Sequence, residues 1–177
     1  MKMFDLSDRI AIVSGAGGQL GGEYVGALLE AGARVVAADV SKLNLPVDDE
    51  MKDRLLQLPM DITSRSDMEN VIKSVSSKWG QPIILVNNAA IDAPPGAGEQ
   101  ETGPFEDYPE SSWDQMMDVN LKGMFLSCQV FGAQMAKGNV GSIINIASIY
   151  GILSPDQRIY EYREERTGKP FYKPITY

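Results

Sequence analysis

The glycine-rich segment 14–22 reads Ser-Gly-Ala-Gly-Gly-Gln-Leu-Gly-Gly and joins an apolar run to an amphipathic one. Glycine permits positive φ angles and a close backbone approach, and the N-terminus of a following helix offers free N–H groups to a phosphate. A strand, this turn and a helix are typical of a dinucleotide site, whose expected binding residues are Gly15, Gly18, Gln19, Leu20 and Gly21. A tight connection without a ligand is the alternative. A P-loop is excluded, because no Gly-Lys-Ser/Thr follows the turn.

Asp39 ends the next apolar run, 24 residues after Gly15. A carboxylate at the end of the second strand of such a unit accepts hydrogen bonds from the ribose hydroxyls of NAD and repels the 2′-phosphate of NADP. NAD is therefore the expected cofactor, although the nearby Lys42 weakens this preference slightly. A solvated aspartate at a strand end is the alternative.

The composition excludes several kinds of chemistry and partner. The sequence has no histidine, which removes Ser-His-Asp hydrolysis, Cys-His chemistry and His-ligated zinc, and we expect no metal site. A net charge of −8 without a dense basic block argues against nucleic acid and anionic membranes as partners. The apolar runs are too short to cross a bilayer, and the first residues do not resemble a signal peptide. The single Cys128 cannot form an internal disulfide, which is typical of the cytoplasm.

The elements that must position these residues alternate along the chain. Short apolar runs between longer amphipathic runs favour βαβ units, and hence an α/β fold with a doubly wound, mostly parallel, Rossmann-type sheet. The predicted strands are 9–14, 34–39, 58–60, 83–87 and 142–146. The predicted helices are 19–31, 51–57, 64–79 and 111–137.

The remaining segments are expected to be irregular. Residues 91–108, rich in proline and glycine, are predicted to form a loop, and residues 149–177 a surface loop or insertion. We expect one domain over residues 1–177, with a sheet that is incomplete on its C-terminal side because the last predicted strand has nothing beyond it.

Taken together, residues 7–148 resemble the short-chain dehydrogenase/reductase family. Residues 14–21 are similar to its Thr-Gly-x-x-x-Gly-x-Gly turn, with Ser14 for threonine and Gln19 for the middle glycine. Residues 87–90, Asn-Asn-Ala-Ala, resemble its Asn-Asn-Ala-Gly, which implies that Asn88 and Ala89 line the cofactor site. The pair Asp61 and Ile62 resembles the residues that meet the adenine ring.

The resemblance also implies a catalytic set. Asn120 looks like the asparagine of the family's catalytic tetrad, and Ser148 looks like its serine. The implied reaction is hydride transfer between nicotinamide and a carbon that bears a hydroxyl or carbonyl group, with a tyrosine moving the proton at the oxygen. Taken singly, Asn120 also fits a helix kink, and Ser148 an ordinary strand end.

The tyrosine is less clearly marked, because no Tyr-x-x-x-Lys occurs in this sequence. In the family that lysine lowers the pKa of the tyrosine. Tyr162 has Arg166 at the same spacing, but arginine is no plain substitute for lysine. We favour Tyr177, since a new helix can begin just after Pro174. The sequence is then expected to be part of a longer protein, with its lysine beyond Tyr177.

The expected function is NAD-dependent oxidation of an alcohol or reduction of a ketone. The tyrosine- and charge-rich residues 157–173 suggest a sugar or other polar small molecule as substrate, although a solvated loop has the same composition. A catalytically incomplete nucleotide-binding or interaction module is the first alternative, favoured by the missing lysine. A sugar-nucleotide epimerase or dehydratase is the second. By analogy with the family, a homo-oligomer, either dimer or tetramer, is expected.

Overall fold

The computed structural model describes residues 4–92 and 98–173. Five strands form one parallel sheet in the order β3-β2-β1-β4-β5. The strands are β1 Ile10–Ser14, β2 Arg34–Asp39, β3 Leu55–Pro59, β4 Ile84–Asn87 and β5 Ser142–Asn145. The α-helices are α1 Gln19–Glu30, α2 Arg65–Lys78, α3 Glu110–Met117, α4 Met124–Lys137 and α5 Glu161–Thr167. The predicted α/β fold with a doubly wound parallel sheet is confirmed.

The strand order has its topological switch point between β1 and β4, where the chain stops adding strands on one side of β1 and starts adding them on the other. The chain runs outward from β1 to β2 and β3, then returns to pair β4 with the other side of β1, with Val13 opposite Val86. Ligands of open α/β sheets bind at the carboxyl ends of the strands at such a point. The turn after Ser14 and the residues after Asn87 therefore meet where a ligand is expected.

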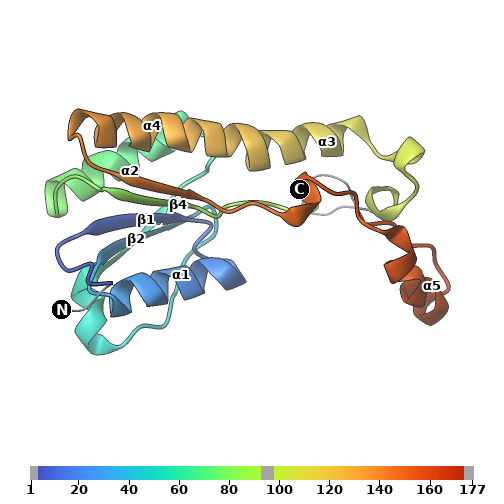
Figure 1. The fold of residues 1–177 in the computed structure, drawn as a ribbon, viewed down its shortest axis with the longest axis horizontal. Helices are drawn as coiled ribbons and strands as arrows, with labels where there is room; N and C mark the ends of the chain where they lie inside the picture. Colours follow the sequence, from blue (N-terminus) through green and yellow to red (C-terminus); the bar gives the residue numbers. More distant parts are fainter. Residues whose placement is uncertain (1–3, 93–97, 174–177) are drawn as a thin grey trace. The chain divides into compact units, whose positions relative to one another are not determined.

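Helices cover both faces of this sheet (Figure 1), with α1 on one face and α2 and α4 on the other. On the α1 face, Val25 and Leu29 pack with Val13, Val35 and other small apolar side chains of the strands. On the other face, Met68 and Val75 of α2 and Phe131 of α4 are fully buried. Burying β-branched residues on both faces is what parallel strands require.

The described residues fall into two compact units. The first comprises residues 4–89 and 122–146 and contains the whole sheet with α1, α2 and α4. The second comprises residues 90–92, 98–121 and 147–173 and contains α3, α5 and several 3-10 turns. Within the described residues, no helix has the length and apolarity needed to cross a membrane.

Four predicted elements need correction. The helix predicted over 51–57 is a 3-10 helix, Asp49–Arg54, and residues 55–57 belong to β3 because they pair with β2. The long helix predicted over 111–137 is interrupted by a π-helical turn, Asp118–Gly123. The segment after Ser148, expected to be irregular, contains α5, which ends at Gly168 with a φ of 70°. The predicted loop over 91–108 contains the 3-10 helices Glu99–Thr102 and Phe105–Asp107.

The last strand, β5, forms an edge of the sheet. Its four residues are all exposed, including Ile143 at 41% and Ile144 at 46%. An apolar strand exposed on both sides is incompletely covered for a parallel sheet. The isoleucines of β5 are therefore less well covered than the apolar residues of the central strands.

Candidate functional site

The turn between β1 and α1 is closed so tightly that two of its glycines are required. Gly15 has a φ of 64°, and a Cβ added there would lie 2.6 Å from the Cα of Ala89. A Cβ on Gly21 would overlap the carbonyl oxygen of Gly15 and lie 2.7 Å from the Cα of Ala16. The first glycine thus allows β4 to approach the turn, and the second allows α1 to pack against it.

The start of α1 is open to a ligand. Gly18 is its N-cap residue, has extended backbone angles and provides no side-chain cap. Gln19 and Leu20 follow with exposed side chains, so Gln19 fits without a glycine at that position. The first N–H groups of a helix have no partner within the helix, and the helix dipole makes them an anion-binding end. This arrangement suits a pyrophosphate.

Asp39 lies at the end of β2, beside the turn. Its Oδ2 accepts a hydrogen bond from the backbone N–H of Gly17 at 2.9 Å. Its Oδ1 accepts from the backbone N–H of Ser41 at 2.8 Å and from the Ser41 hydroxyl at 2.7 Å. The carboxylate predicted to bind ribose is therefore oriented toward the glycine turn.

The end of β4 is fastened to the end of β1 by the hydroxyl of Ser14, which is fully buried. This hydroxyl accepts hydrogen bonds from the N–H groups of Asn88 at 3.1 Å and Ala89 at 3.2 Å. In return, the Asn88 side-chain amide donates to the carbonyls of Ser14 at 3.2 Å and Gly15 at 3.0 Å. The predicted residues Asn88 and Ala89 thus hold the turn in place at the site.

The neighbouring Asn87 has a different role, because strand alternation directs its side chain to the α4 face. Asn87 is 1% exposed, and its Oδ1 accepts from the hydroxyl of Ser127 at 2.6 Å. Its Nδ2 donates to Asn145 Oδ1 at 2.8 Å and lies 3.3 Å from the sulfur of Cys128. This polar network, in which Asn87 and Ser127 are buried, joins β4, β5 and α4.

Asp61 and Ile62 follow β3, next to Asp39, whose carbonyl accepts from the N–H of Met60 at 2.9 Å. Asp61 Oδ1 accepts from both the N–H of Thr63 at 2.8 Å and its hydroxyl at 2.7 Å. Ile62 is only 5% exposed, and its side chain packs against Gly123 so closely that a Cβ on Gly123 would lie 2.8 Å from it. Ile62 therefore presents its backbone, rather than its side chain, to any ligand at this edge.

Of the predicted catalytic residues, Asn120 and Ser148 belong to the second unit, and Tyr177 lies outside the described residues. Asn120 lies in the π-helical turn, and both ends of its amide are engaged with Ile91. Its Oδ1 accepts from the Ile91 N–H at 2.8 Å, and its Nδ2 donates to the Ile91 carbonyl at 2.9 Å. The Ser148 hydroxyl accepts from the N–H of Tyr150 at 3.1 Å. The alternative tyrosine, Tyr162, is 51% exposed on α5.

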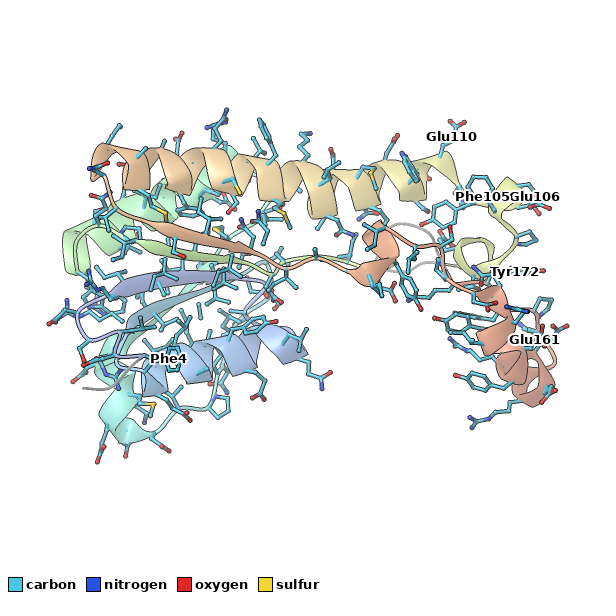
Figure 2. The ribbon with its side chains drawn as sticks, viewed as in Figure 1. Phe4, Phe105, Glu106, Glu110, Glu161 and Tyr172 are labelled. Atoms are coloured by element: carbon cyan, nitrogen blue, oxygen red, sulfur yellow. The ribbon has the colours of Figure 1, made fainter. Side chains whose placement is uncertain are left out.

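The second unit also contains a pocket of about 320 Å³ between the segment before α3 and the segment after α5. Its lining combines aromatic and polar side chains: Glu101, Phe105, Glu106, Tyr108, Gln157, Tyr172 and Lys173, together with Gly103 and Pro104. Figure 2 shows Phe105 and Glu106 on one of these segments and Tyr172 on the other.

Hydrogen bonds and an ion pair hold the two walls of this pocket together. The N–H of Tyr172 donates to the Thr102 carbonyl at 2.8 Å. The Gln157 amide pairs with the backbone of Lys173 through bonds of 3.1 and 2.8 Å. The Lys173 ammonium, whose side chain is 13% exposed, contacts both carboxylate oxygens of Asp92 at 2.8 and 2.7 Å. The segment 149–173 is thereby attached to the residues that follow β4.

Two residues that help to build the site were missed by the sequence analysis. Ser14 was noted only as a replacement for threonine, yet its hydroxyl joins the two central strands. The signal was its place as the last residue of a buried strand, where a hydroxyl needs partners. Ser41, which bonds Asp39 twice, gave no pattern in the sequence.

Comparison with known proteins adds independent evidence. The family model described as short chain dehydrogenase matches residues 9–162. The chain is 31% identical over 159 residues to a Listeria innocua protein named NAD-dependent glycerol dehydrogenase, covering 89% of this chain and 59% of that protein. It is 32% identical over 148 residues to an uncharacterized oxidoreductase of Staphylococcus aureus, covering 82% of this chain and 61% of that protein.

Solved structures agree with these matches. A short chain dehydrogenase from Leptospira borgpetersenii with bound NAD+ has a TM-score of 0.75 and 30% identity, covering 88% of this chain and 57% of that chain. The chain spans about three fifths of the length of the curated relatives it matches.

Proposed function

The chain belongs to the short-chain dehydrogenase family, and from this premise we propose that it binds NAD and serves the oxidation of an alcohol or the reduction of a ketone. The observation that carries the proposal is the joint arrangement of the tight turn after β1, the uncapped start of α1 and the oriented carboxylate of Asp39. NAD binding needs a pyrophosphate site and, about 20 residues further along the chain, a carboxylate for the ribose; the turn and Asp39 support these roles.

The residues fit the cofactor in detail. The N–H groups at the start of α1 suit the pyrophosphate, and Asp39 suits the hydroxyls of the adenosine ribose. Asp61 and the backbone of Ile62 would lie beside the adenine, and Asn88, which bonds the turn, would help to hold the turn under the cofactor. When bound, NAD supplies the hydride acceptor of the oxidation.

The proton chemistry is proposed for residues of the second unit and for Tyr177. Ser148 would hold the reacting oxygen of the substrate through its hydroxyl, and Tyr177 would take the proton from that oxygen. A free phenol has a pKa near ~10, so a base at neutral pH requires a cation beside it. Asn120 would have an indirect, positioning role, because its side chain makes two hydrogen bonds with the backbone of Ile91 and its own backbone lies in a π-helical turn.

The substrate we propose is a polyol, a sugar or another polar small molecule. The pocket of the second unit combines aromatic rings with carboxylates such as Glu101 and Glu106, which accept hydrogen bonds from hydroxyl groups. The relative from Listeria innocua is named for glycerol, a small polyol, which agrees with a polyol or sugar as substrate. We further propose a homo-oligomer in the cytoplasm, on the family analogy and on the single cysteine.

The experiment is a titration of the protein with NAD by calorimetry, followed by an assay of NADH formation with glycerol and other polyols. Binding of NAD that is weakened at least tenfold by Asp39→Ala supports the cofactor site. NADH formation that Ser148→Ala abolishes, with NAD affinity unchanged, supports the catalytic role. NAD binding without turnover of any alcohol would favour a nucleotide-binding module instead, and absence of NAD binding would overturn the proposal.

A further inference from the structure

Asp39 is held more firmly than a strand-end aspartate requires. Both donors on its Oδ1 come from Ser41, whose backbone N–H and hydroxyl lie at 2.8 and 2.7 Å. Two donors on one oxygen fix the rotation of the carboxyl group, because a turn of the group breaks both bonds. The other oxygen, Oδ2, is thereby directed at the glycine turn, where it contacts the N–H of Gly17.

The space around the turn supports the same arrangement. A Cβ on Gly17 would lie 2.9 Å from the Ser41 hydroxyl oxygen and 3.1 Å from Asp39 Oδ2. The hydroxyl of Ser41 and the carboxylate of Asp39 therefore both pack against the backbone of the turn at one residue. All three groups are exposed or half-buried, so a ribose can reach them from solvent.

We propose that Ser41 is a positioning residue that sets the preference of this site for NAD over NADP by holding the Asp39 carboxylate toward the cofactor. The inference rests on the proposed function. A carboxylate fixed in this way accepts the ribose hydroxyls without losing further rotational freedom, and it cannot turn away from a 2′-phosphate. Once the hydroxyl is removed, the backbone N–H groups of Ser41 and Gly17 still bind the carboxylate, but it is held by one bond fewer and turns more easily. The exposed Lys42 next to it can then attract the phosphate.

The test compares the Kd values for NAD and NADP in four proteins: the unaltered chain, Ser41→Ala, Ser41→Thr and Ser77→Ala. Ser41→Ala keeps the backbone bond and removes one hydroxyl bond, so we expect the Kd for NAD to rise about fivefold, the equivalent of about 1 kcal/mol. The Kd for NADP should stay unchanged or fall, and the NAD preference should decrease by at least fivefold. Ser41→Thr retains the hydroxyl and should restore the preference. Ser77→Ala removes an exposed serine of α2 and should have no effect.

The ratio of the Kd values for NAD and NADP distinguishes an effect of Ser41 on the carboxylate from a loss of folded protein, because unfolding would weaken the binding of both cofactors equally. Ser41→Ala with an unchanged ratio, in a protein whose unaltered form prefers NAD, would overturn the inference and leave the proposed function intact. Ser41→Thr behaving like Ser41→Ala would overturn it as well. An unaltered protein that binds neither cofactor would overturn the proposed function itself, and the inference with it.

Discussion

The tight closure of the turn predicts opposite effects for two glycines of the same helix. Gly21 and Gly26 both lie in α1, and alanine at either position should gain ~0.5–1 kcal/mol from reduced freedom of the unfolded chain. A Cβ at Gly26 meets no atom within 4 Å, whereas a Cβ at Gly21 overlaps the Gly15 carbonyl and lies 2.7 Å from Ala16 Cα. Both of these neighbours are backbone atoms, so the strain cannot be relieved by a side-chain rotation. Overpacking of this kind costs ~1–3 kcal/mol.

The assay is urea unfolding of both variants, followed by far-UV circular dichroism. Gly26→Ala should be more stable than the unaltered protein by ~0.5–1 kcal/mol, and Gly21→Ala should lie ~1–3 kcal/mol below Gly26→Ala. The gain in stability on replacing a helical glycine by alanine is common to both variants, so the difference between their unfolding free energies measures the cost of the clash at Gly21. In thermal unfolding the gap should correspond to ~2–4 °C per kcal/mol for a chain of this size. Equal midpoints for the two variants would refute the claim that the turn leaves no room beside α1.

Three further predictions concern polar groups. Asn87→Leu leaves the buried Ser127 hydroxyl of α4 and the Asn145 amide of β5 without their partner, and urea unfolding should show a loss of ~2–4 kcal/mol in stability. A loss below ~0.5 kcal/mol, typical of a surface substitution, would contradict a stabilising role for these hydrogen bonds. A double-mutant cycle of Lys173→Met with Asp92→Asn should give a coupling of ~0.5–1 kcal/mol, since Asp92 remains 58% exposed; additive effects argue against the ion pair. The side-chain hydrogen bond from Arg158 lowers the pKa of Asp156, so this bond is lost as the pH falls through that pKa. Arg158→Ala should raise the pKa of Asp156, which NMR titration of the carboxylate would measure.

Elements with a strong local pattern could be predicted from the sequence. β2 was predicted with its observed bounds, and β1 and α1 to within one residue, because the two strands are short continuous apolar runs and the apolar residues of α1 repeat at the helical period. The error at β3 has a physical cause. Residues 55–57 were assigned to a helix on local pattern, but pairing of Leu55 with Val35 and of Gln57 with Ala37 makes them a strand. Such pairing depends on a partner that is distant in sequence.

The candidate site could be predicted where a motif depends on backbone shape. Gly15 was identified from the glycine-rich turn and Asn88 from the resemblance of residues 87–90 to the family's Asn-Asn-Ala-Gly. The structure brings the two residues together, with the Asn88 amide donating to the Gly15 carbonyl. Ser41 could not be identified, because its contacts with Asp39 arise from the path of a loop and follow no period. The π-helical turn at Asn120 was hidden for a similar reason, since its apolar spacing resembles that of an ordinary helix.

The division of residues between the two units bears on how binding and chemistry depend on each other. Every contact proposed for the adenosine and pyrophosphate comes from residues 14–21, 39, 61–62 and 88–89, all within the first unit. They are held by hydrogen bonds within that unit, such as those from the Asn88 N–H to the Ser14 hydroxyl and from the Ser41 hydroxyl to Asp39. Ser148 and Asn120 belong to the second unit, as do their hydrogen-bond partners Tyr150 and Ile91. Substitutions in the second unit should therefore alter turnover while leaving NAD affinity nearly constant, whereas loss of the Asp39 carboxylate should weaken binding before any chemical step.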